Sequence, residues 1–284
     1  MKPTVKNGNG QKNGIRRIGA GQSAAKETAG TLRIRAADLT EVIFPRFCAV
    51  CGRRLDRHES HLCIYCAAEI PFTDYWNRRE NKMADRLNSL IQKDIESIAE
   101  ECGAAAHEQY SYAAALFFYR DDSGFSRIPQ KLKYHGDLKL GRHFGAMLGA
   151  RLAQSALFSD VDMVIPVPLH WARRWRRGYN QAAVLGRETA AKLGTEMRED
   201  ILVRHRRTGT QTKLGTKDKM RNVEGAFKVR DGAEKACCEA GHILLIDDVF
   251  TSGATIRECH RALREKCGPG IRISAATLAF VEGP

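Results

Sequence analysis

The stretch from Gly241 to Thr255 constrains the fold of this 284-residue chain more than any other. Four consecutive apolar residues, 243–246, predict a strand that is buried on both faces, as in a parallel sheet. A loop of small residues follows, and residues 256–266 then place apolar side chains on one helical face. Strand, loop and helix form half of a doubly wound unit, in which ligands bind beyond the carboxyl ends of the strands. The sequence therefore predicts an α/β fold with a mainly parallel sheet.

The loop in this unit has the composition of an anion site. We expect the adjacent acids Asp247 and Asp248 to end the strand and to accept hydrogen bonds from the vicinal hydroxyls of a ribose. Backbone N–H groups of residues 251–255, the nearby hydroxyls and the dipole of the following helix would hold a phosphate. Gly253 would let the backbone approach the ligand without a Cβ clash. The residues expected to bind are Asp247, Asp248, Val249, Phe250, Thr251, Ser252, Gly253, Ala254 and Thr255.

Neither the Walker A pattern nor the dinucleotide-binding glycine pattern occurs in this loop. A nearby magnesium ion would hold the oxygens of a pyrophosphate group on the ligand. For any one of these residues, ordinary turn and capping chemistry is the simpler explanation. The phosphate interpretation depends on the whole string of acids, hydroxyls and glycine between a buried strand and a helix.

Two C-x-x-C knuckles lie in a module expected over residues 41–75. Cys48 with Cys51 and Cys63 with Cys66 have the spacing of a four-thiolate zinc site, which would be structural because four thiolates leave no open position. About 30 residues cannot build a core alone, so metal binding would drive the folding of this module. Redox-active pairs or disulfides are the alternative. The other cysteines are scattered along the sequence.

Composition limits the classes of partner. The net charge of +13 favours polyanions, either nucleic acid or phosphorylated metabolites. Residues 1–40 are basic and poor in large apolar groups, which predicts a disordered arm, with a transit peptide as the alternative. No apolar run is long enough to span a membrane, and without a secretory signal we expect a reducing cytoplasm.

The middle of the chain alternates predicted helices and strands. Apolar residues recur at helical spacing over 78–102 and 138–153, and residues 161–168 read as a strand that ends in prolines. Four arginines then fall within residues 173–177, in a loop expected before a helix over 182–193. Arginine suits phosphate because its planar fork binds two oxygens. A solvated basic face, or a nucleic-acid patch with stacking by Trp171 and Trp175, is the alternative.

Four blocks in order identify a resemblance. They are the cysteine knuckles, residues 133–137 (KYHGD), the stretch from Val167-Pro168 to residues 177–181 (RGYNQ), and the acidic loop. Over roughly residues 41–284 the chain resembles the ComF family (competence protein F), whose transferase part is similar to type I phosphoribosyltransferases. The resemblance implies a zinc module (41–75), a helical connector (76–112) and a phosphoribosyltransferase-like domain (113–284). The basic arm (1–40) is not part of the family pattern.

The resemblance also implies a ligand, 5-phosphoribosyl-1-pyrophosphate (PRPP) or a related ribose phosphate, with magnesium. Asp247, Asp248 and Arg177 would be catalytic, Arg177 through the pyrophosphate, and Lys133 would contact phosphate. Residues 204–227, including Arg204, Arg206, Thr208, Gln211, Leu214, Arg221, Asn222, Gly225 and Phe227, resemble the flexible loop that closes over such sites.

Three function classes stay open at this point. The first is a transferase that acts on an unidentified nitrogen acceptor. The second is a non-catalytic protein that binds PRPP, nucleotide or single-stranded DNA beside competence proteins. The third is a zinc-dependent adaptor, against which the intact pair of acids argues. The oligomeric state is also open, a dimer included.

Overall fold

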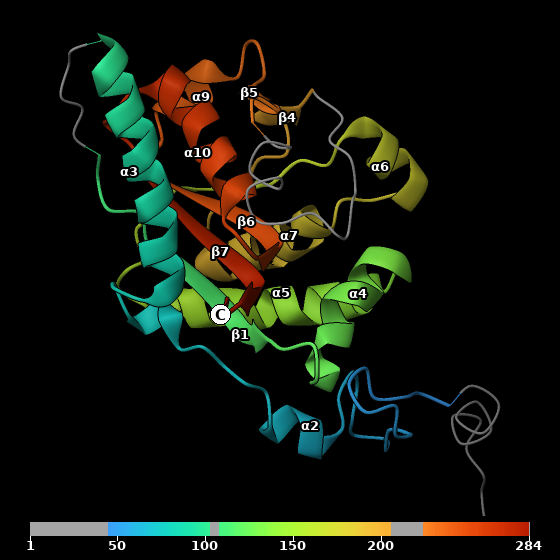
Figure 1. Cartoon of the computed structure of the whole chain (residues 1–284). Helices are drawn as coiled ribbons and strands as arrows, with labels where there is room; N and C mark the ends of the chain where they lie inside the picture. Colours follow the sequence, from blue (N-terminus) through green and yellow to red (C-terminus); the bar gives the residue numbers. More distant parts are fainter. Residues whose placement is uncertain (1–44, 103–107, 206–223, 284) are drawn as a thin grey trace, which may run out of the picture. The chain divides into compact units, whose positions relative to one another are not determined.

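A parallel sheet of five strands, in the order β1-β7-β6-β2-β3, forms the centre of the molecule (Figure 1). The computed structural model describes residues 45–102, 108–205 and 224–283. The strands are β1 (Ala113–Tyr119), β2 (Met163–Pro166), β3 (Glu196–Met197), β6 (His242–Phe250) and β7 (Arg272–Val281). The sheet and the four-cysteine cluster near the N-terminus confirm the predicted α/β class with a small cysteine module. The arm predicted over residues 1–40 lies outside the described residues.

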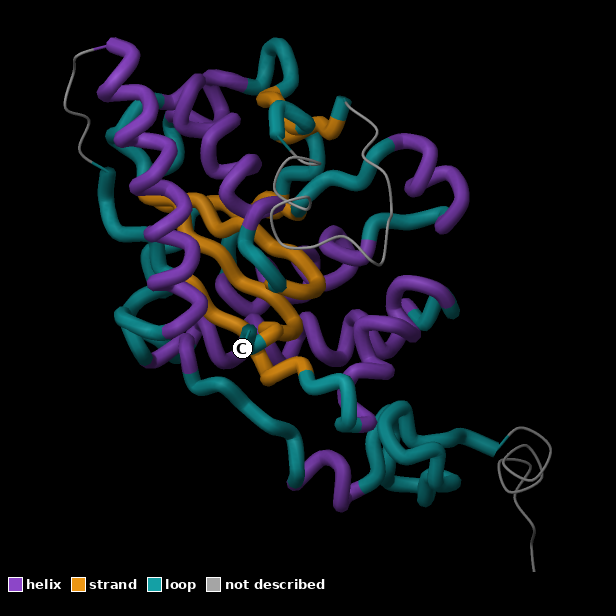
Figure 2. Tube along the Cα trace, in the orientation of Figure 1, coloured by secondary structure: helices purple, strands orange, loops and turns teal. Residues whose placement is uncertain are grey.

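Helices cover both faces of the sheet (Figure 2). The connections from β1 to β2 and from β2 to β3 run in one direction across the sheet, and that from β6 to β7 runs in the other. Because such crossovers are right-handed, α5 (Leu138–Ala153) and α7 (Gln181–Leu193) belong to one face and α10 (Ala254–Cys267) to the opposite face. In agreement, α5 packs on α7, and α10 packs on α3 (Lys82–Cys102).

The helices predicted from apolar periodicity agree closely with the structure. α5 has the predicted bounds, and its apolar face is buried, as is that of α10 at Ile256, Cys259 and Leu263. The helix predicted from residue 78 begins at Lys82, because the buried Asn81 side chain accepts hydrogen bonds from the N–H groups of Met83 and Ala84.

The shorter elements surround the sheet. They are α2 (Ile64–Ala68), η1 (Tyr75–Asn77), η2 (Gly124–Ser126), α4 (Arg127–Tyr134), α6 (Trp171–Arg177), α9 (Glu234–Cys238), β4 (Leu202–Arg204) and β5 (Phe227–Val229). The last two strands pair antiparallel in a separate small sheet. None of the helices within the described ranges is both long and apolar enough to cross a membrane.

Two elements differ from the sequence prediction. β6 does not end at the acids but continues to Phe250, because Asp247, Val249 and Phe250 keep their pairing with β7. The arginine-rich stretch is a helix, α6, and not a loop. The His170 side chain caps the start of α6 by accepting from the Ala172 N–H, and Gly178 ends it at φ +78°.

The cysteine module contacts the sheet domain directly. Arg127 at the start of α4 donates to the backbone oxygen of Val50, at 2.9 Å between Nη1 and O. Gly124 leaves room for the turn that contains Val50, since a Cβ at Gly124 would lie 2.8 Å from Val50. Phe72 then forms a bridge with Phe117 of β1. The module is thus held against the domain by backbone contacts as well as by apolar packing.

Candidate active site and metal centre

The two acids of the predicted site lie near the carboxyl end of β6, within reach of a lysine from α4. Lys133 Nζ is 3.1 Å from Asp248 Oδ2, and Asp248 is only 7% exposed. Asp247 is half-buried, and its Oδ1 accepts a hydrogen bond of 2.8 Å from the Asp248 N–H. Residues 115 positions apart in sequence order therefore meet as an ion pair beside a second carboxylate.

The three side chains of this cluster, Lys133, Asp247 and Asp248, together carry more negative than positive charge. Burial, followed by repulsion from the neighbouring Asp248 carboxylate, raises the pKa of Asp247 to about 7. Burial opposes the charge on Lys133, but Asp248 and Asp247 outweigh it and raise the pKa of the ammonium. Such a site favours groups that donate hydrogen bonds to carboxylates, as sugar hydroxyls do.

The turn after β6 leads straight into the N-terminus of α10. Gly253 adopts φ +84°, and a Cβ at this position would lie 2.7 Å from the Phe250 ring, so the turn requires glycine. Arg86 of α3 donates to the backbone oxygen of Thr251 at 2.7 Å and fixes the turn from outside. Thr251 is exposed, and Ser252 and Thr255 are partly exposed. Backbone N–H groups at a helix start attract anions, so this turn can accept a phosphate next to the acids.

Arg177 lies at the end of α6, where that helix approaches the end of α4. Its guanidinium lies over the ring of Tyr134, at 5.5 Å from the centroid, and its buried Nε lacks a hydrogen-bond partner. The Tyr179 hydroxyl donates to the backbone oxygen of Leu132. These contacts bring the RGYNQ block to the residues on either side of Lys133, so two blocks of the predicted site are neighbours.

Arg204, predicted as part of the flexible loop, lies at the end of β4 with its guanidinium over the Phe227 ring at 5.0 Å. Burial and then the charge of Arg173 lower the pKa of Arg204, and Arg204 in turn opposes the rise in the pKa of Asp247. The positive charge of Arg204, at the end of β4, therefore acts on the Asp247 carboxyl. Arg206, Thr208, Gln211, Leu214, Arg221 and Asn222, also predicted for this loop, lie outside the described residues.

No motif predicted the contacts that Arg86 and Tyr179 make in the site. Arg86 is near the start of the amphipathic helix α3, and its hydrogen bond to Thr251 spans 165 positions. Tyr179 belongs to a predicted block, but a tyrosine's hydrogen-bond partner follows only from how α4 and α7 pack. Both residues hold backbone segments of the site through these hydrogen bonds.

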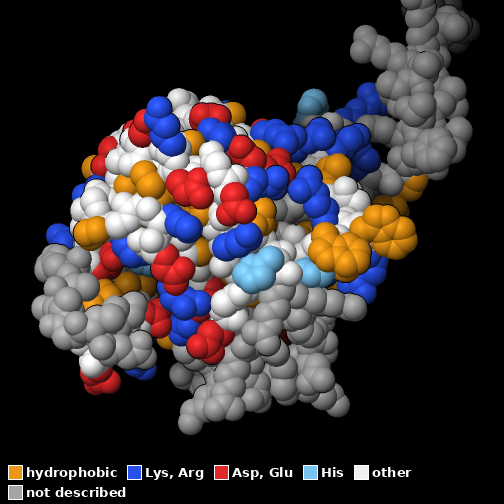
Figure 3. Space-filling model, turned by 90° about the horizontal axis from the view of Figure 1, so that it is seen from above, with side chains coloured by type: hydrophobic (Ala, Val, Ile, Leu, Met, Phe, Trp, Pro, Cys, Tyr) orange, Lys and Arg blue, Asp and Glu red, His pale blue; other side chains and the backbone are white. Residues whose placement is uncertain are grey.

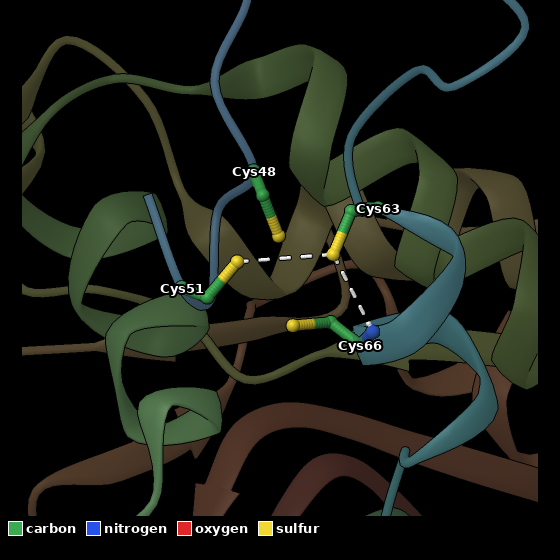
Figure 4. A group of neighbouring side chains, drawn as sticks. All are labelled: Cys48, Cys51, Cys63 and Cys66. Carbon is green, nitrogen blue, oxygen red and sulfur yellow. Dashed lines mark hydrogen bonds between the residues drawn. The ribbon is translucent and has the colours of Figure 1, made fainter. Parts of the chain in front are cut away.

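The four cysteines of the knuckles converge on one point (Figure 4). The Sγ atoms of Cys48, Cys51, Cys63 and Cys66 all lie within 4.8 Å of one another. The Cys66 N–H donates to Cys63 Sγ at 3.5 Å. Burial opposes ionisation of Cys48, but N–H groups of Cys51, Cys63 and Val50 lower its pKa to about 6. Burial raises the pKa of Cys66. Four converging sulfurs, of which Cys48 is stabilised as a thiolate, fit a tetrahedral zinc ion. The His61 ring lies against the His143 ring, with 5.0 Å between centroids and a tilt of 43°.

Comparisons with known proteins find relatives that cover most of the chain. Competence protein F of Haemophilus influenzae is 25% identical over 221 residues, which cover 77% of this chain and 90% of that protein. The chain is a homologue of competence protein F. Competence protein ComFC of Bacillus subtilis is 28% identical over 149 residues, covering 52% of this chain and 56% of the relative. These relatives confirm the resemblance to the ComF family.

A shorter match covers part of another group of relatives. DNA utilization protein YhgH of Salmonella typhi is 33% identical over 117 residues, which are 41% of this chain and 46% of that protein. No protein-family model matches the chain. Among solved structures, an orotate phosphoribosyltransferase from Aeropyrum pernix has a TM-score of 0.29 and 13% identity, over 66% of this chain and 81% of that one.

Proposed function

We propose that the chain binds PRPP with magnesium and transfers its phosphoribosyl group to a nitrogen acceptor, in the service of DNA uptake or utilisation. The link to DNA comes from relatives named as competence and DNA utilization proteins. The ligand is argued from the site itself. The observation that carries the proposal is the pair Asp247 and Asp248 next to the Gly253 turn, with Lys133 bound to one of the acids.

Each part of the site suits one part of PRPP. The two carboxylates would accept hydrogen bonds from the ribose hydroxyls. The N–H groups and hydroxyls of residues 251–255, at the start of α10, would hold the 5′-phosphate. Arg177, close to Lys133 through Tyr134, would bind the pyrophosphate oxygens bidentately. Lys133 would exchange its contact with Asp248 for a phosphate oxygen once the ribose hydroxyls reach that carboxylate.

The reaction needs positioning and charge more than a catalytic base. A nitrogen lone pair forms the bond to ribose C1′, the bond from C1′ to the pyrophosphate oxygen breaks, and pyrophosphate leaves with that electron pair while the acceptor's proton passes to solvent. Magnesium, when bound, supplies charge that stabilises the departing pyrophosphate. The chain's own groups hold C1′ in place and stabilise the developing charges, negative through Arg177 and positive through Asp247 and Asp248.

A second function, nucleic-acid binding without transfer, is favoured by a specific surface. On α6 the side chains of Trp171 and Trp175 are 72% and 87% exposed, next to Arg174 and Arg176. Exposed hydrophobic side chains also stand beside Lys and Arg side chains in Figure 3. Bases stack on aromatic rings and arginines attract the phosphate backbone, which makes this helix a candidate surface for single-stranded DNA.

Titration calorimetry with PRPP and magnesium tests the ligand. The full chain should bind, and the Asp247→Asn, Asp248→Asn double variant should lose binding. The matched control is Asp121→Asn, Asp122→Asn, which alters an adjacent pair of exposed aspartates in the turn after β1 and should keep wild-type affinity. A wild-type chain that ignores millimolar PRPP would contradict the proposal and leave the adaptor function.

Pyrophosphate release over a panel of ammonia, amines and nucleobases then separates transfer from binding alone. Release with one acceptor, lost in the double variant, supports the enzyme. Binding of PRPP with no release across the panel supports the second function. That function also predicts salt-sensitive binding of single-stranded DNA, weakened by Trp171→Ala, Trp175→Ala.

A further inference from the structure

Three cysteines that are far apart in sequence meet in the transferase part of the molecule. Cys237 and Cys238 end α9, and Cys267 is the last residue of α10. Their Sγ atoms all lie within 4.8 Å of one another, and those of Cys237 and Cys267 are 2.7 Å apart. α9 packs against α10 at this end of the domain (Figure 1). None of these residues belongs to the knuckles or to the proposed PRPP site.

The environment of the cluster combines a buried sulfur with access from solvent. Cys237 is fully buried, Cys267 is partly buried and Cys238 is exposed. Cys237 Sγ donates to the Glu234 backbone oxygen at 3.2 Å, and Cys238 Sγ donates to the Lys266 backbone oxygen at 3.6 Å. An ion could thus reach the cluster from the Cys238 side and find three sulfur donors. These sulfurs now contact one another and backbone carbonyl oxygens.

We propose that Cys237, Cys238 and Cys267 bind one thiophilic d10 metal ion of the Zn²⁺ or Cu⁺ class, at a site separate from the four-cysteine centre. Thiolate ligands select such ions over hard cations. On binding, three S–H groups lose their protons to solvent and three sulfur–metal bonds form. Three protein ligands complete a trigonal site for Cu⁺, whereas Zn²⁺ would take water as a fourth ligand.

A metal site explains the cluster better than a reactive disulfide pair does. A bond between Cys237 and Cys267 would leave Cys238 without a part in the cluster. A metal ion with high affinity for sulfur displaces the thiol protons itself and uses all three sulfurs, which lie within 4.8 Å of one another.

The position of the cluster gives the site a structural consequence. α9 connects β5 of the small sheet to β6, which carries the two acids, and the N-terminus of α10 forms the phosphate turn. One ion bound by both α9 and α10 would link the connection from β5 to β6 with the connection from β6 to β7. Loading the site should therefore raise the melting temperature of the transferase part.

Cadmium titration of the full chain, in a non-thiol reductant, tests the site. Cd²⁺ is a thiophilic d10 probe whose bonds to thiolates absorb in the ultraviolet. Two equivalents should bind, one per cluster, and the second should raise the melting temperature. Cys237→Ser, Cys267→Ser should keep only the equivalent at the four-cysteine centre. The Cys238→Ala variant changes only the exposed cysteine of the cluster. It should weaken binding of the second equivalent about tenfold or more.

Cys259→Ala is the matched control, since Cys259 is a buried cysteine of α10 outside the cluster, and this variant should still bind two equivalents. The proposal fails if the wild-type chain saturates at one equivalent, or if the second equivalent persists in Cys237→Ser, Cys267→Ser. It also fails if mass spectrometry finds a Cys237–Cys267 disulfide in the chain under the reducing conditions of the titration.

Discussion

Replacing Asp247 with asparagine should stabilise the ligand-free protein while destroying its PRPP site. In the free protein the ammonium of Lys133 forms an ion pair with Asp248 and is also stabilised by the charge of Asp247. An asparagine keeps an oxygen that can accept the 2.8 Å hydrogen bond from the Asp248 N–H. It removes the charge whose burial and repulsion raise the pKa of Asp247 to about 7. The variant therefore measures how far the Asp247 carboxylate, which would bind the sugar, lowers the stability of the ligand-free protein.

The sign and size of the effect follow from that pKa. A carboxyl whose pKa rises from 3.8 in the unfolded chain to about 7 in the folded protein contributes its full stability below about pH 4. It loses this contribution as the pH rises to 7. At about 1.4 kcal/mol per pKa unit, the largest change in the free energy of unfolding is about 4 kcal/mol. Because Asp247 is half-buried, solvent screening reduces this to about 1–2 kcal/mol. In a domain of this size that raises the melting temperature by about 3–6 °C.

Thermal and urea unfolding of the wild-type and Asp247→Asn chains, measured from pH 4 to pH 8, tests this reasoning. The variant should match the wild type near pH 4 and exceed it increasingly up to pH 7, with a constant difference above. Asp121→Asn, at an exposed position, should show no such rise. An Asp247→Asn chain that is no more stable than the wild type at pH 8 would refute the claim that the site holds a costly carboxylate.

Three further predictions concern other parts of the site and the metal centre. Lys133→Met should lower the free energy of unfolding by about 2 kcal/mol in urea titrations, because it leaves buried Asp248 without its ion-pair partner; wild-type stability would contradict this. Gly253→Ala should weaken PRPP binding at least about tenfold by calorimetry and destabilise the chain more than Gly232→Ala does. Both glycines have positive φ, but only a Cβ at Gly253 meets another residue, so equal effects would count against the turn geometry. Chelation should remove one zinc ion from the four cysteines and unfold that module before the sheet domain, as followed by metal analysis and hydrogen exchange; intact protection in zinc-free protein would exclude a structural metal.

Local signals in the sequence predicted the parts of the fold that local physics determines. The apolar run before Asp247 gave β6, and the periodicity after Ala254 gave α10. The spacing of the knuckles predicted that Cys48 and Cys66 would share one site, which the converging sulfurs confirm. In each case the pattern extends over one element or one pair of turns.

What the sequence did not predict depends on contacts between distant segments. β6 continues past its acids only because Thr277 to Phe280 of β7 offer a pairing edge. A dense run of arginines suggests a loop, yet α6 forms because His170 and Gly178 supply caps. The Lys133 pairing with Asp248 and the meeting of Cys237 with Cys267 depend on how α4 and α9 pack, which periodicity along one segment does not reveal.

The decisive measurement is a crystal structure of the full chain with PRPP and magnesium. We predict the 5′-phosphate against the N–H groups of residues 252–255, with the ribose hydroxyls within hydrogen-bond distance of the carboxylates of Asp247 and Asp248. Two results would contradict the proposed site: density for PRPP at another place on the molecule, or Asp248 still bound to Lys133 with no sugar beside the two carboxylates at saturating ligand.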